Sequence, residues 1–315
     1  MKQGFLILIV IHISNCCLLS QTKIIDSIIT KELLYKHISA LANDSMKGRY
    51  SGSQTNVDAG NYIRNQYYNI GLKEITDYPN YFDEVIANTQ FYGYNVIGAI
   101  LGKDSIKKNK VIILSAHYDH IGTSESIERL GYKTPVDQIY NGANDNASGT
   151  ATVLALAEYF KVLDSNNYTL LFVAFTGEEE GLVGSNYMAN KMDKKDIHQV
   201  FNFEMLGRLS TRKLKPFVTA ASKKFIASLN TNLLQSDSTY GNKFFISDPY
   251  STENLDSRSD NYSFNKKGVN AVTIMLTSPT DRYYHKFDDE IGTLDFVTMQ
   301  KVVKAIALAI TPLLQ

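Results

Sequence analysis

The chain has 315 residues, of which 44% are hydrophobic, so it is long enough to bury a substantial core. Lysine plus arginine and aspartate plus glutamate both number 32, which gives a formal net charge of zero. A nucleic-acid or anionic-membrane partner would favour a basic excess, so the composition indicates neither class of partner.

The first residues have the pattern of a secretory leader. Lys2 precedes an apolar run over residues 4–13, which has about the length of a signal-peptide core. A membrane-spanning helix needs roughly 20 apolar residues, so this run is too short to span. We expect residues 1–20 to be cleaved near Ser20, and the mature chain to be exported without a transmembrane segment. A buried N-terminal helix is the alternative.

Both cysteines, Cys16 and Cys17, lie in this leader. The mature chain would then contain no cysteine and no disulfide, so its core must be sufficient for stability. A lipid anchor on Cys16 is disfavoured because Asn15 is not the small residue typical of that cleavage site. The choice between periplasm and medium, and the oligomeric state, are not encoded in any pattern of this kind.

The mature chain begins with helical patterns and continues with alternating strand and helix patterns. Helical spacing of apolar residues occurs first at residues 30–42 and 58–70, and Gly71 is a natural stop. The expected strands are residues 94–101, 111–115, 168–175, 200–203 and 271–276, and the later helices are residues 147–163, 222–234 and 294–314. This alternation predicts a three-layer α/β sandwich, in which helices flank a central, mostly parallel mixed sheet. No repeat or linker divides residues 21–315, so we expect a single domain.

Ionisable side chains collect where the expected strands end. They are His117 and Asp119 after residues 111–115, Glu178, Glu179 and Glu180 after residues 168–175, Glu204 after residues 200–203, and His285 in the loop after residues 271–276. Asp145 lies among the small residues NGANDNASG at 141–149, just before a helical pattern. Ligands of an open α/β sheet bind beyond the carboxyl ends of its strands, so we expect one shared site.

The residue types in these segments indicate a metal site. Five of the six histidines follow the leader, and His117, His120 and His285 lie in the segments after the strands. Imidazole with carboxylate and no thiolate is a ligand set that suits zinc in an open, catalytic site. Two histidines and several carboxylates exceed what one ion needs, so they favour two metal ions that share a bridging carboxylate.

Each of these residues also has an ordinary structural explanation. His117 could be a loop histidine held by Asp119, and the three glutamates could form a solvated acidic turn. Glu204 could be a strand-end charge that faces water, and His285 could stack on its tyrosine neighbours. Asp145 could be only a helix N-cap, a position that aspartate favours. The metal-site hypothesis therefore depends on all of them falling at one edge of one sheet.

Taken together, the segments resemble the co-catalytic di-zinc aminopeptidase family, which includes bacterial leucyl aminopeptidases, glutamate carboxypeptidase and glutaminyl cyclases. The matching stretches are AHYDHIG (116–122), NGANDNASGTA (141–151), FTGEEEGLVGS (175–185), NFEMLG (202–207), SDNYSF (259–264) and YYHKFDD (283–289). Residues 41–56 resemble the family's N-terminal segment, and residues 94–102 resemble its first strand. The resemblance covers about residues 33–310 in order, and it implies the phosphorylase/hydrolase-like fold of zinc exopeptidases.

The resemblance implies a role for each matching residue. His117 and Glu204 would bind one zinc ion, Glu179 and His285 would bind the other, and Asp145 would bridge both. Glu178 would act as the general base on a metal-bridged water, and Asp119 would orient His117. The resemblance also implies a cis peptide bond between Asp145 and Asn146. Either Tyr283 or Tyr284 could donate a hydrogen bond to the oxyanion, or both could simply pack beneath the metal loop.

Two positions depart from the family pattern. Glu204 stands where relatives usually have aspartate, and its longer side chain could bind in another mode or weaken that metal site. Asn261 stands where the family often has histidine, so we assign it no catalytic role. No glycine-rich phosphate loop follows a strand, which argues against a nucleotide cofactor.

The sequence thus predicts a secreted zinc aminopeptidase that acts on peptides with a free N-terminus. One rival is a glutaminyl cyclase-like acyltransferase with a single zinc ion, but that group lacks the first histidine ligand, whereas His117 is present. Another is a non-catalytic peptide-binding relative, although such relatives lose ligands that this chain keeps. Carboxypeptidase or dipeptidase action within the family stays open. Side-chain specificity would depend on loops such as residues 124–138 and 236–256.

Overall fold

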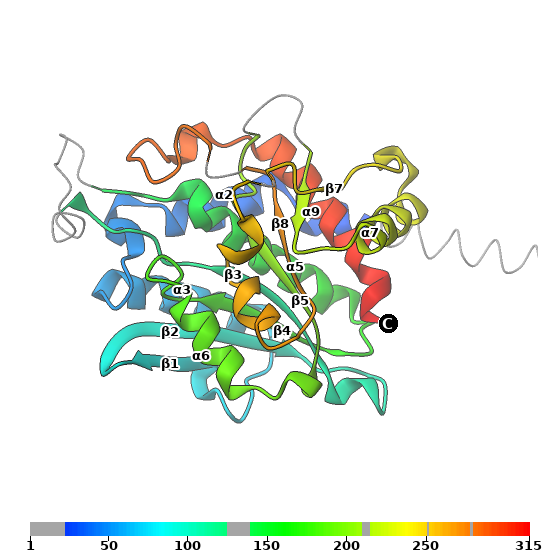
Figure 1. The fold of residues 1–315 in the computed structure, drawn as a ribbon, viewed down its shortest axis with the longest axis horizontal. Helices are drawn as coiled ribbons and strands as arrows, with labels where there is room; N and C mark the ends of the chain where they lie inside the picture. Colours follow the sequence, from blue (N-terminus) through cyan, green and yellow to red (C-terminus); the bar gives the residue numbers. More distant parts are fainter. Residues whose placement is uncertain (1–22, 125–138, 210–214, 251, 278–279) are drawn as a thin grey trace, which may run out of the picture.

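The computed structural model describes residues 23–124, 139–209, 215–250, 252–277 and 280–315 (Figure 1). The expected leader, with Cys16 and Cys17, lies outside the described residues, as does most of the loop at residues 124–138. Leader cleavage, export and the absence of a lipid anchor therefore stay predictions.

A mixed sheet of eight strands forms the centre of the described fold, in the order β1-β2-β4-β3-β5-β8-β6-β7. Strands β4, β3, β5 and β8 are parallel neighbours, β2 runs antiparallel to β4, and β6 runs antiparallel to β8. The strands are β1 (Phe82–Ala87), β2 (Gln90–Ile100), β3 (Val111–His117), β4 (Thr169–Phe175), β5 (Ile197–Glu204), β6 (Phe217–Thr219), β7 (Ile246–Ser247) and β8 (Ala271–Met275). The predicted sheet with a parallel centre is confirmed.

Helices cover both faces of this sheet, which makes three layers (Figure 1). One face carries α2 (Lys31–Leu41), α3 (Gln54–Ile70), α5 (Gly149–Leu163), α7 (Lys223–Ser236) and α9 (Phe296–Ile310), and the other carries α6 (Val183–Lys191) and α8 (Asn261–Asn265). Alternate residues of each central strand point their side chains into the two helical layers. Ile112 and Leu114 of β3 pack into the core that contains α5, whereas Ile113 packs with Met188 of α6. Burial on both faces explains why the central strands are continuous apolar runs.

Capping residues set the helix boundaries. The Ser53 side chain accepts a hydrogen bond from the amide of Asn56, so α3 begins at Gln54, earlier than the expected residue 58. Gly71 ends the same helix in the left-handed conformation, with φ of 79°, as predicted. Thr30 and Ser222 cap α2 and α7 in the same way as Ser53.

The elements that the sequence analysis missed are short, polar or at the sheet edge. They are β1, β6, β7, α6 and α8. Residues 94–101, expected to lie in the first strand, belong to β2, because β1 precedes them and pairs with them in antiparallel. Strands β6 and β7 have three and two residues, too few for an alternating pattern to be recognised.

One helical segment among the described residues, Phe296–Leu314, is long and apolar enough to cross a membrane by length and composition alone. It consists of α9 and the turn that follows, and 61% of its apolar 18-residue stretch is buried inside the molecule. Its residues pack with those of α2, α5 and α7 in the main core. This environment is that of a core helix, and the sequence analysis had predicted a helix over residues 294–314.

Candidate metal centre

The parallel strands deliver the predicted side chains to one edge of the sheet. His117 is the last residue of β3 and Glu204 is the last residue of β5, while Glu178 and Glu179 follow β4. Because these strands are parallel neighbours, their carboxyl ends meet at the same edge. Asp145 reaches this edge from the turn Ala143–Ser148 that precedes α5, in which Asp145 and Asn146 have non-helical backbone angles.

Two groups of metal-ligating atoms lie side by side at this edge. One consists of His117, Asp145 and Glu204, and the other of His120, Asp145, Glu179 and His285, with the ligand atoms in each group within 4.8 Å of one another. Asp145 belongs to both groups. The five residues expected to bind metal are thus brought together, divided as the resemblance implied, and His120 joins them.

Distances within the groups fit a tetrahedral ion. Two ligand atoms that each lie about 2.1 Å from zinc at a tetrahedral angle are about 3.4 Å apart. His117 Nε2 lies 3.4 Å from Asp145 Oδ1 and 3.5 Å from Glu204 Oε1. His285 Nε2 lies 3.2 Å from Asp145 Oδ2 and 3.1 Å from Glu179 Oε2. Each oxygen of Asp145 therefore faces a different histidine, which is the geometry of a bridging carboxylate.

The imidazole nitrogens that face these carboxylates have no other role. The Nε2 atoms of His117 and His285 are buried without a hydrogen-bond partner in the described structure. The Nδ1 atom of His117 donates to the main-chain carbonyl of Asp119 at 3.2 Å, which leaves Nε2 with its lone pair toward the site. Because buried polar atoms are normally paired, these nitrogens fit a metal ion, and the nitrogen and oxygen donor set suits zinc.

Small residues allow the chain to pass close to the centre at Asp145. A Cβ atom on Gly149 would lie 2.3 Å from the carbonyl oxygen of Phe203, and one on Gly142 would lie 2.5 Å from the ring of His120. The peptide bond between Asp145 and Asn146 is cis, as the resemblance implied. The amides of Asn144 and Asp145 each donate to the carboxylate of Asp289 at 3.0 Å, which holds this turn in place.

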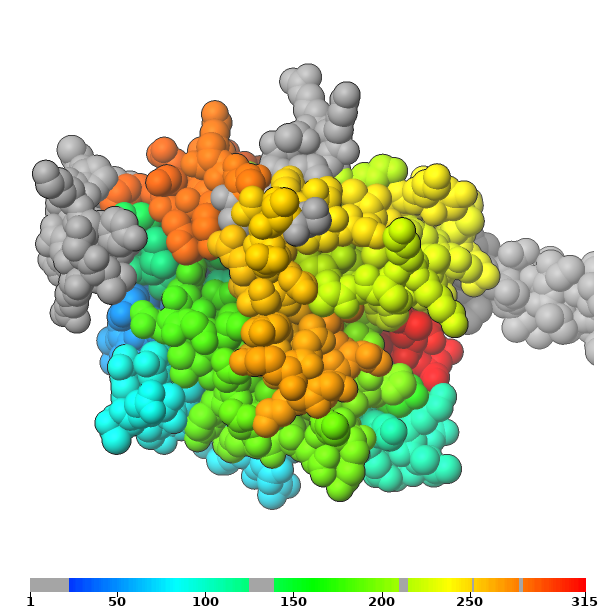
Figure 2. Space-filling view, in the orientation of Figure 1, coloured from blue at the N-terminus to red at the C-terminus, as the bar shows by residue number. Residues whose placement is uncertain are grey.

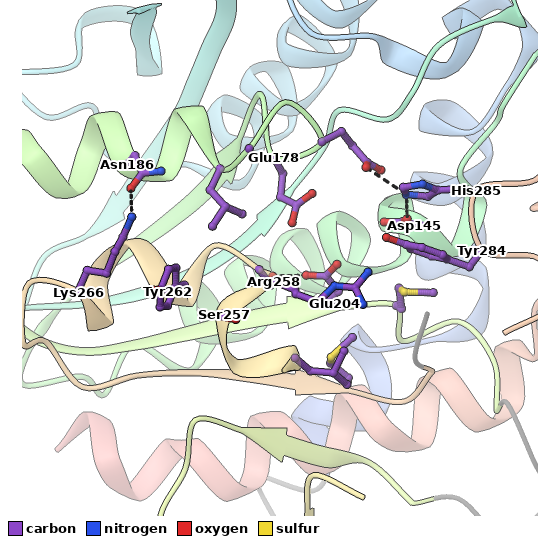
Figure 3. Close-up of a pocket in the computed structure, with 17 residues that line it drawn as sticks. Asp145, Glu178, Asn186, Glu204, Ser257, Arg258, Tyr262, Lys266, Tyr284 and His285 are labelled. Atoms are coloured by element: carbon purple, nitrogen blue, oxygen red, sulfur yellow. Dashed lines mark hydrogen bonds and ion pairs between the residues drawn. The ribbon is translucent and has the colours of Figure 1, made fainter. Parts of the chain in front are cut away.

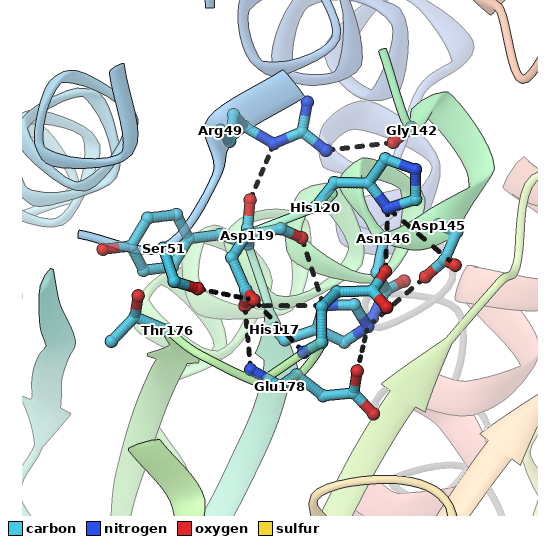
Figure 4. A network of polar contacts seen from close by, with 12 residues as sticks. Arg49, Ser51, His117, Asp119, His120, Gly142, Asp145, Asn146, Thr176 and Glu178 are labelled. Carbon is cyan, nitrogen blue, oxygen red and sulfur yellow. Dashed lines mark hydrogen bonds and ion pairs between the residues drawn. The ribbon is translucent and has the colours of Figure 1, made fainter. Parts of the chain in front are cut away.

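Asp119 ties the acidic turn to the end of β3 (Figure 4). Its carboxylate accepts from the amides of Glu178 and Glu179, at 3.2 and 3.3 Å, and from the hydroxyl of Ser51 at 3.0 Å. The nearer carboxylate oxygen is 3.7 Å from Nδ1 of His117, farther than the Asp119 carbonyl oxygen. The expected contact with His117 thus runs mainly through the main chain, and the carboxylate positions the two glutamates.

Glu178 lies beside the two groups but belongs to neither. Its Oε2 atom is 3.9 Å from Nε2 of His117, and its side chain is 10% exposed. Burial raises the pKa of its carboxyl well above the ordinary value, and the nearby charges of Glu204 and Glu179 act in the same direction. A carboxyl group with a high proton affinity, held off the metal ligands, can take up a proton during a reaction.

The opposite effect operates between His285 and its two carboxylates. Burial alone would lower the pKa of His285, but Asp145 and Glu179 outweigh it and raise the pKa to about 10. Burial and the charge of Asp145 likewise oppose ionisation of Glu179, yet its close contacts with His120 and His285 lower the pKa of its carboxyl to about 2. The carboxylates of this group therefore stabilise a positive charge next to the histidine nitrogens that face them.

The two tyrosines expected as oxyanion candidates face different surroundings. Tyr284 lines the pocket and stacks on His285, with ring centroids 3.9 Å apart. Tyr283 instead lies between the guanidinium groups of Arg208 and Arg282, each 4.5 Å from its ring centroid. Only Tyr284 is thus positioned to reach a molecule in this pocket.

Several buried residues at the centre were not predicted to have a role. His120 Nδ1 lies 2.9 Å from Glu179 Oε1, so it contacts a predicted ligand directly. Arg49 donates to the carbonyls of Leu41, Tyr118, Asn141 and Gly142. Asp260 is also buried, and its pKa is raised to about 7, chiefly by desolvation. Each lies within a stretch that carries the family resemblance, but the stretch alone does not say what the side chain contacts.

A pocket of 510 Å³ opens onto the centre (Figure 3). Asp145, Glu178, Glu179, Glu204 and His285 line its metal end, and Met205, Leu255, Met275 and Tyr284 form an apolar wall. Figure 2 shows the face where the segment around residue 260, in gold, lies beside the green segment around residue 185. Both segments contribute to the pocket, through Tyr262 and Asn186 for example. The volume is within the range of about 300–1,000 Å³ typical of small-ligand pockets.

Comparison with known proteins yields consistent matches. The sequence pattern of peptidase family M28 matches residues 95–310 of this chain. Aminopeptidase YwaD of Bacillus subtilis (strain 168) is 24% identical over 223 residues, which are 69% of this chain and only 44% of that protein. A probable leucine aminopeptidase of Trichophyton verrucosum (strain HKI 0517) is 28% identical over 308 residues, or 90% of this chain and 73% of that protein. The solved structure of BSAP, a zinc aminopeptidase from Bacillus subtilis, has a TM-score of 0.68 at 16% identity and covers 91% of this chain and 96% of that chain. The structural likeness confirms the predicted α/β fold.

Proposed function

The chain belongs to peptidase family M28, and on that premise we propose that it is a zinc aminopeptidase that removes the N-terminal residue from peptides. The observation that carries this proposal is the pair of ligand groups that share Asp145, with Glu178 beside them. His117, Asp145 and Glu204 would hold one zinc ion, and Asp145, Glu179 and His285 would hold the second.

The chemistry then divides between the metal and the protein. When bound, zinc supplies Lewis acidity that polarises the scissile carbonyl group and lowers the pKa of the attacking water to about 7. Glu178 accepts the proton of that water and delivers it to the amine of the departing peptide. Tyr284, at the wall of the pocket, is the candidate donor to the oxyanion. Asp119 keeps Glu178 and Glu179 in place through their amides.

Glu204 is compatible with this proposal although relatives usually have aspartate at its position. Its Oε1 atom faces His117, and its Oε2 atom accepts a hydrogen bond from the hydroxyl of Ser259. One oxygen is therefore held by the protein, and the other is directed to the first ligand group. The longer side chain is accommodated by Ser259 rather than left without a partner, which supports occupancy of both metal positions.

The main rival is a cyclase-like acyltransferase with one zinc ion, because the resemblance includes such enzymes. His117 is the observation against it, since its Nε2 atom is directed at both Asp145 and Glu204. A non-catalytic relative would have no need of a buried Glu178 beside a complete set of ligands.

The experiment is a zinc count per chain followed by hydrolysis of a panel of aminoacyl-p-nitroanilides, with Glu178→Gln as the matched variant. We expect two zinc ions in both proteins, and at least a 100-fold loss of kcat in the variant, the scale of a general base. One zinc ion without amide cleavage would favour the cyclase, which an N-terminal glutamine peptide then tests. A chain that binds no zinc would contradict the proposal.

Export is a separate part of the proposal. It rests on the leader-like pattern of residues 1–20 alone. Expression of the full chain, followed by N-terminal sequencing of the exported protein, tests it. A new terminus near residue 21 supports export, and retention of an uncut chain inside the cell contradicts it.

A further inference from the structure

Two cationic side chains line the pocket, and one of them, Lys266, lies at the end away from His285. Arg258 lies just before α8 and Lys266 just after it, and both line the same cavity as Glu178. They are the only lysine and arginine among the described residues that line it. Figure 3 shows Lys266 and His285 at opposite ends of the pocket, with Glu178 between them.

Both cations are available to an anionic ligand. Lys266 Nζ donates to Asn186 Oδ1 at 3.1 Å and lies 5.0 Å from the centre of the Tyr262 ring, and within the described ranges it has no ion-pair partner. Arg258 has one described ion pair, with Glu253 at 3.8 Å, in which the two side chains are 42% and 38% exposed. An exposed pair at that distance contributes little, so it does not commit the guanidinium.

The acidic side chains are gathered at one end of the pocket. Four carboxylates, those of Asp145, Glu178, Glu179 and Glu204, lie at the metal end. Two divalent zinc ions would neutralise them, so Arg258 and Lys266 would leave the cavity with a net positive charge. That charge favours a substrate with a negative group at some distance from the scissile bond.

The apolar wall determines which way a peptide would lie. Met205 adjoins Glu204 in the sequence and Tyr284 adjoins His285, so this wall lies at the metal end. The side chain of an apolar N-terminal residue would pack against it. The remainder of the peptide would then lead away from the metal end, toward Lys266.

We infer that Lys266 forms a carboxylate-binding subsite on the leaving-group side of the scissile bond, and that Arg258, whose guanidinium lies nearer Glu204 (Figure 3), adds positive charge to the pocket. The subsite favours short peptides whose second or third residue presents a carboxylate. That group is either the C-terminus of a dipeptide or tripeptide, or an aspartate or glutamate side chain. This inference rests on the proposed aminopeptidase function.

The first test is equilibrium binding by calorimetry to zinc-loaded Glu178→Gln protein, in which turnover is checked to be absent. We expect Leu-Ala and Leu-Asp-amide to bind about five- to tenfold more tightly than Leu-Ala-amide, the scale of a partly exposed charge-assisted contact. Adding Lys266→Met or Arg258→Gln should reduce this ratio, whereas Lys267→Met, on the exposed neighbour that does not line the pocket, should preserve it. Equal affinity for all three peptides would overturn the subsite.

The second test is turnover by the wild-type protein and by Lys266→Met. The substitution should raise KM for Leu-Ala with kcat unchanged, and it should raise KM for leucine p-nitroanilide several-fold less because that substrate carries no carboxylate; Lys267→Met should change neither. A binding preference without any hydrolysis would contradict the proposed function and support the subsite. Hydrolysis without a carboxylate preference would support the proposed function and contradict the subsite. Preference for only one of Leu-Ala and Leu-Asp-amide identifies which source of carboxylate the subsite takes.

Discussion

Single atoms decide how the second ligand group works, and Glu179 is the clearest case. Its Oε2 atom faces His285 at 3.1 Å, while its Oε1 atom faces Nδ1 of His120 at 2.9 Å. One oxygen is thereby directed to the metal position, and the other is restrained by a buried donor. Partners of this kind orient the ligands of metal sites and commonly contribute 10- to 100-fold in affinity or activity. His120 is therefore a positioning residue.

Replacing His120 tests this assignment. We expect His120→Ala to lower the zinc affinity of the second group by about 10- to 100-fold, because Oε1 of Glu179 loses its donor. Zinc retained per chain after dialysis against graded chelator measures the effect. His120→Asn, whose amide can replace the Nδ1 donor, should restore much of the affinity. If both variants lose zinc equally, the ring acts through packing alone, and a matched urea titration would show the lost stability.

At the scale of elements, the loops around the metal centre are fastened by one buried arginine. Arg49 is 0% exposed, and it is the last residue of a short turn, Asp44–Arg49, between α2 and α3. Its guanidinium bonds to the carbonyl oxygens of Leu41 at the end of α2, Tyr118 after β3, and Asn141 before the turn that carries Asp145. Three segments that are distant in the chain are thus locked together beside the ligands.

Removing this charge should unfold the loops and lower global stability. We expect Arg49→Met to reduce the free energy of unfolding by about 3 kcal/mol, because buried carbonyl groups lose charge-assisted partners. Urea unfolding measures this, and Lys224→Met, on the exposed surface of α7, provides the comparison. A loss in Arg49→Met no larger than in the control would mean that water or neighbouring amides satisfy these carbonyls.

At the scale of the whole molecule, stability depends on a sheet that is buried on both faces. It also depends on ionisable side chains that are buried in their neutral form. His37 of α2 is 2% exposed, and its Nδ1 atom is 2.8 Å from the hydroxyl of Tyr62 in α3. Burial lowers its pKa from 6.5 to about 3, with a smaller contribution from Lys36. None of the candidate metal ligands contributes to this shift, so the titration of His37 is separate from theirs.

The sign of the pH effect follows from that shift. Above pH 6.5 the folded and unfolded chains both carry neutral His37, so its contribution to stability is complete. As the pH falls, only the unfolded chain binds the proton, and at pH 5 this destabilises the fold by about 2 kcal/mol. We expect His37→Gln to lose less unfolding free energy than wild type between pH 7.5 and pH 5, as measured by urea titration. The His198→Gln variant should change the slope less than His37→Gln, because burial lowers the pKa of this more exposed histidine by less. Identical slopes for all three proteins would refute the assignment.

Much of the fold and most of the centre were predictable because the informative patterns are local. Apolar runs marked the four parallel strands, and the residues directly after them included His117, Glu179 and Glu204. Gly71 marked a helix end from its identity alone. Strand β1 was missed because its buried positions are Asp83 and Val85, so the charged aspartate hides the apolar alternation that marks a strand. Strands β6 and β7 were missed because two or three residues carry no period.

What the sequence by itself determined is the layering of the fold and the kinds of ligand at the sheet edge, since both are written in neighbouring residues. The tertiary structure decided which carboxylate oxygen faces which imidazole, and it brought His120, Arg49 and Asp289 to the centre. The amide of Asp145 bonds to Asp289 across 144 positions of the chain, and Arg49 bonds to Asn141 across 92. Contacts of that range depend on how strands and helices pack in three dimensions, and no local pattern of residue types specifies them.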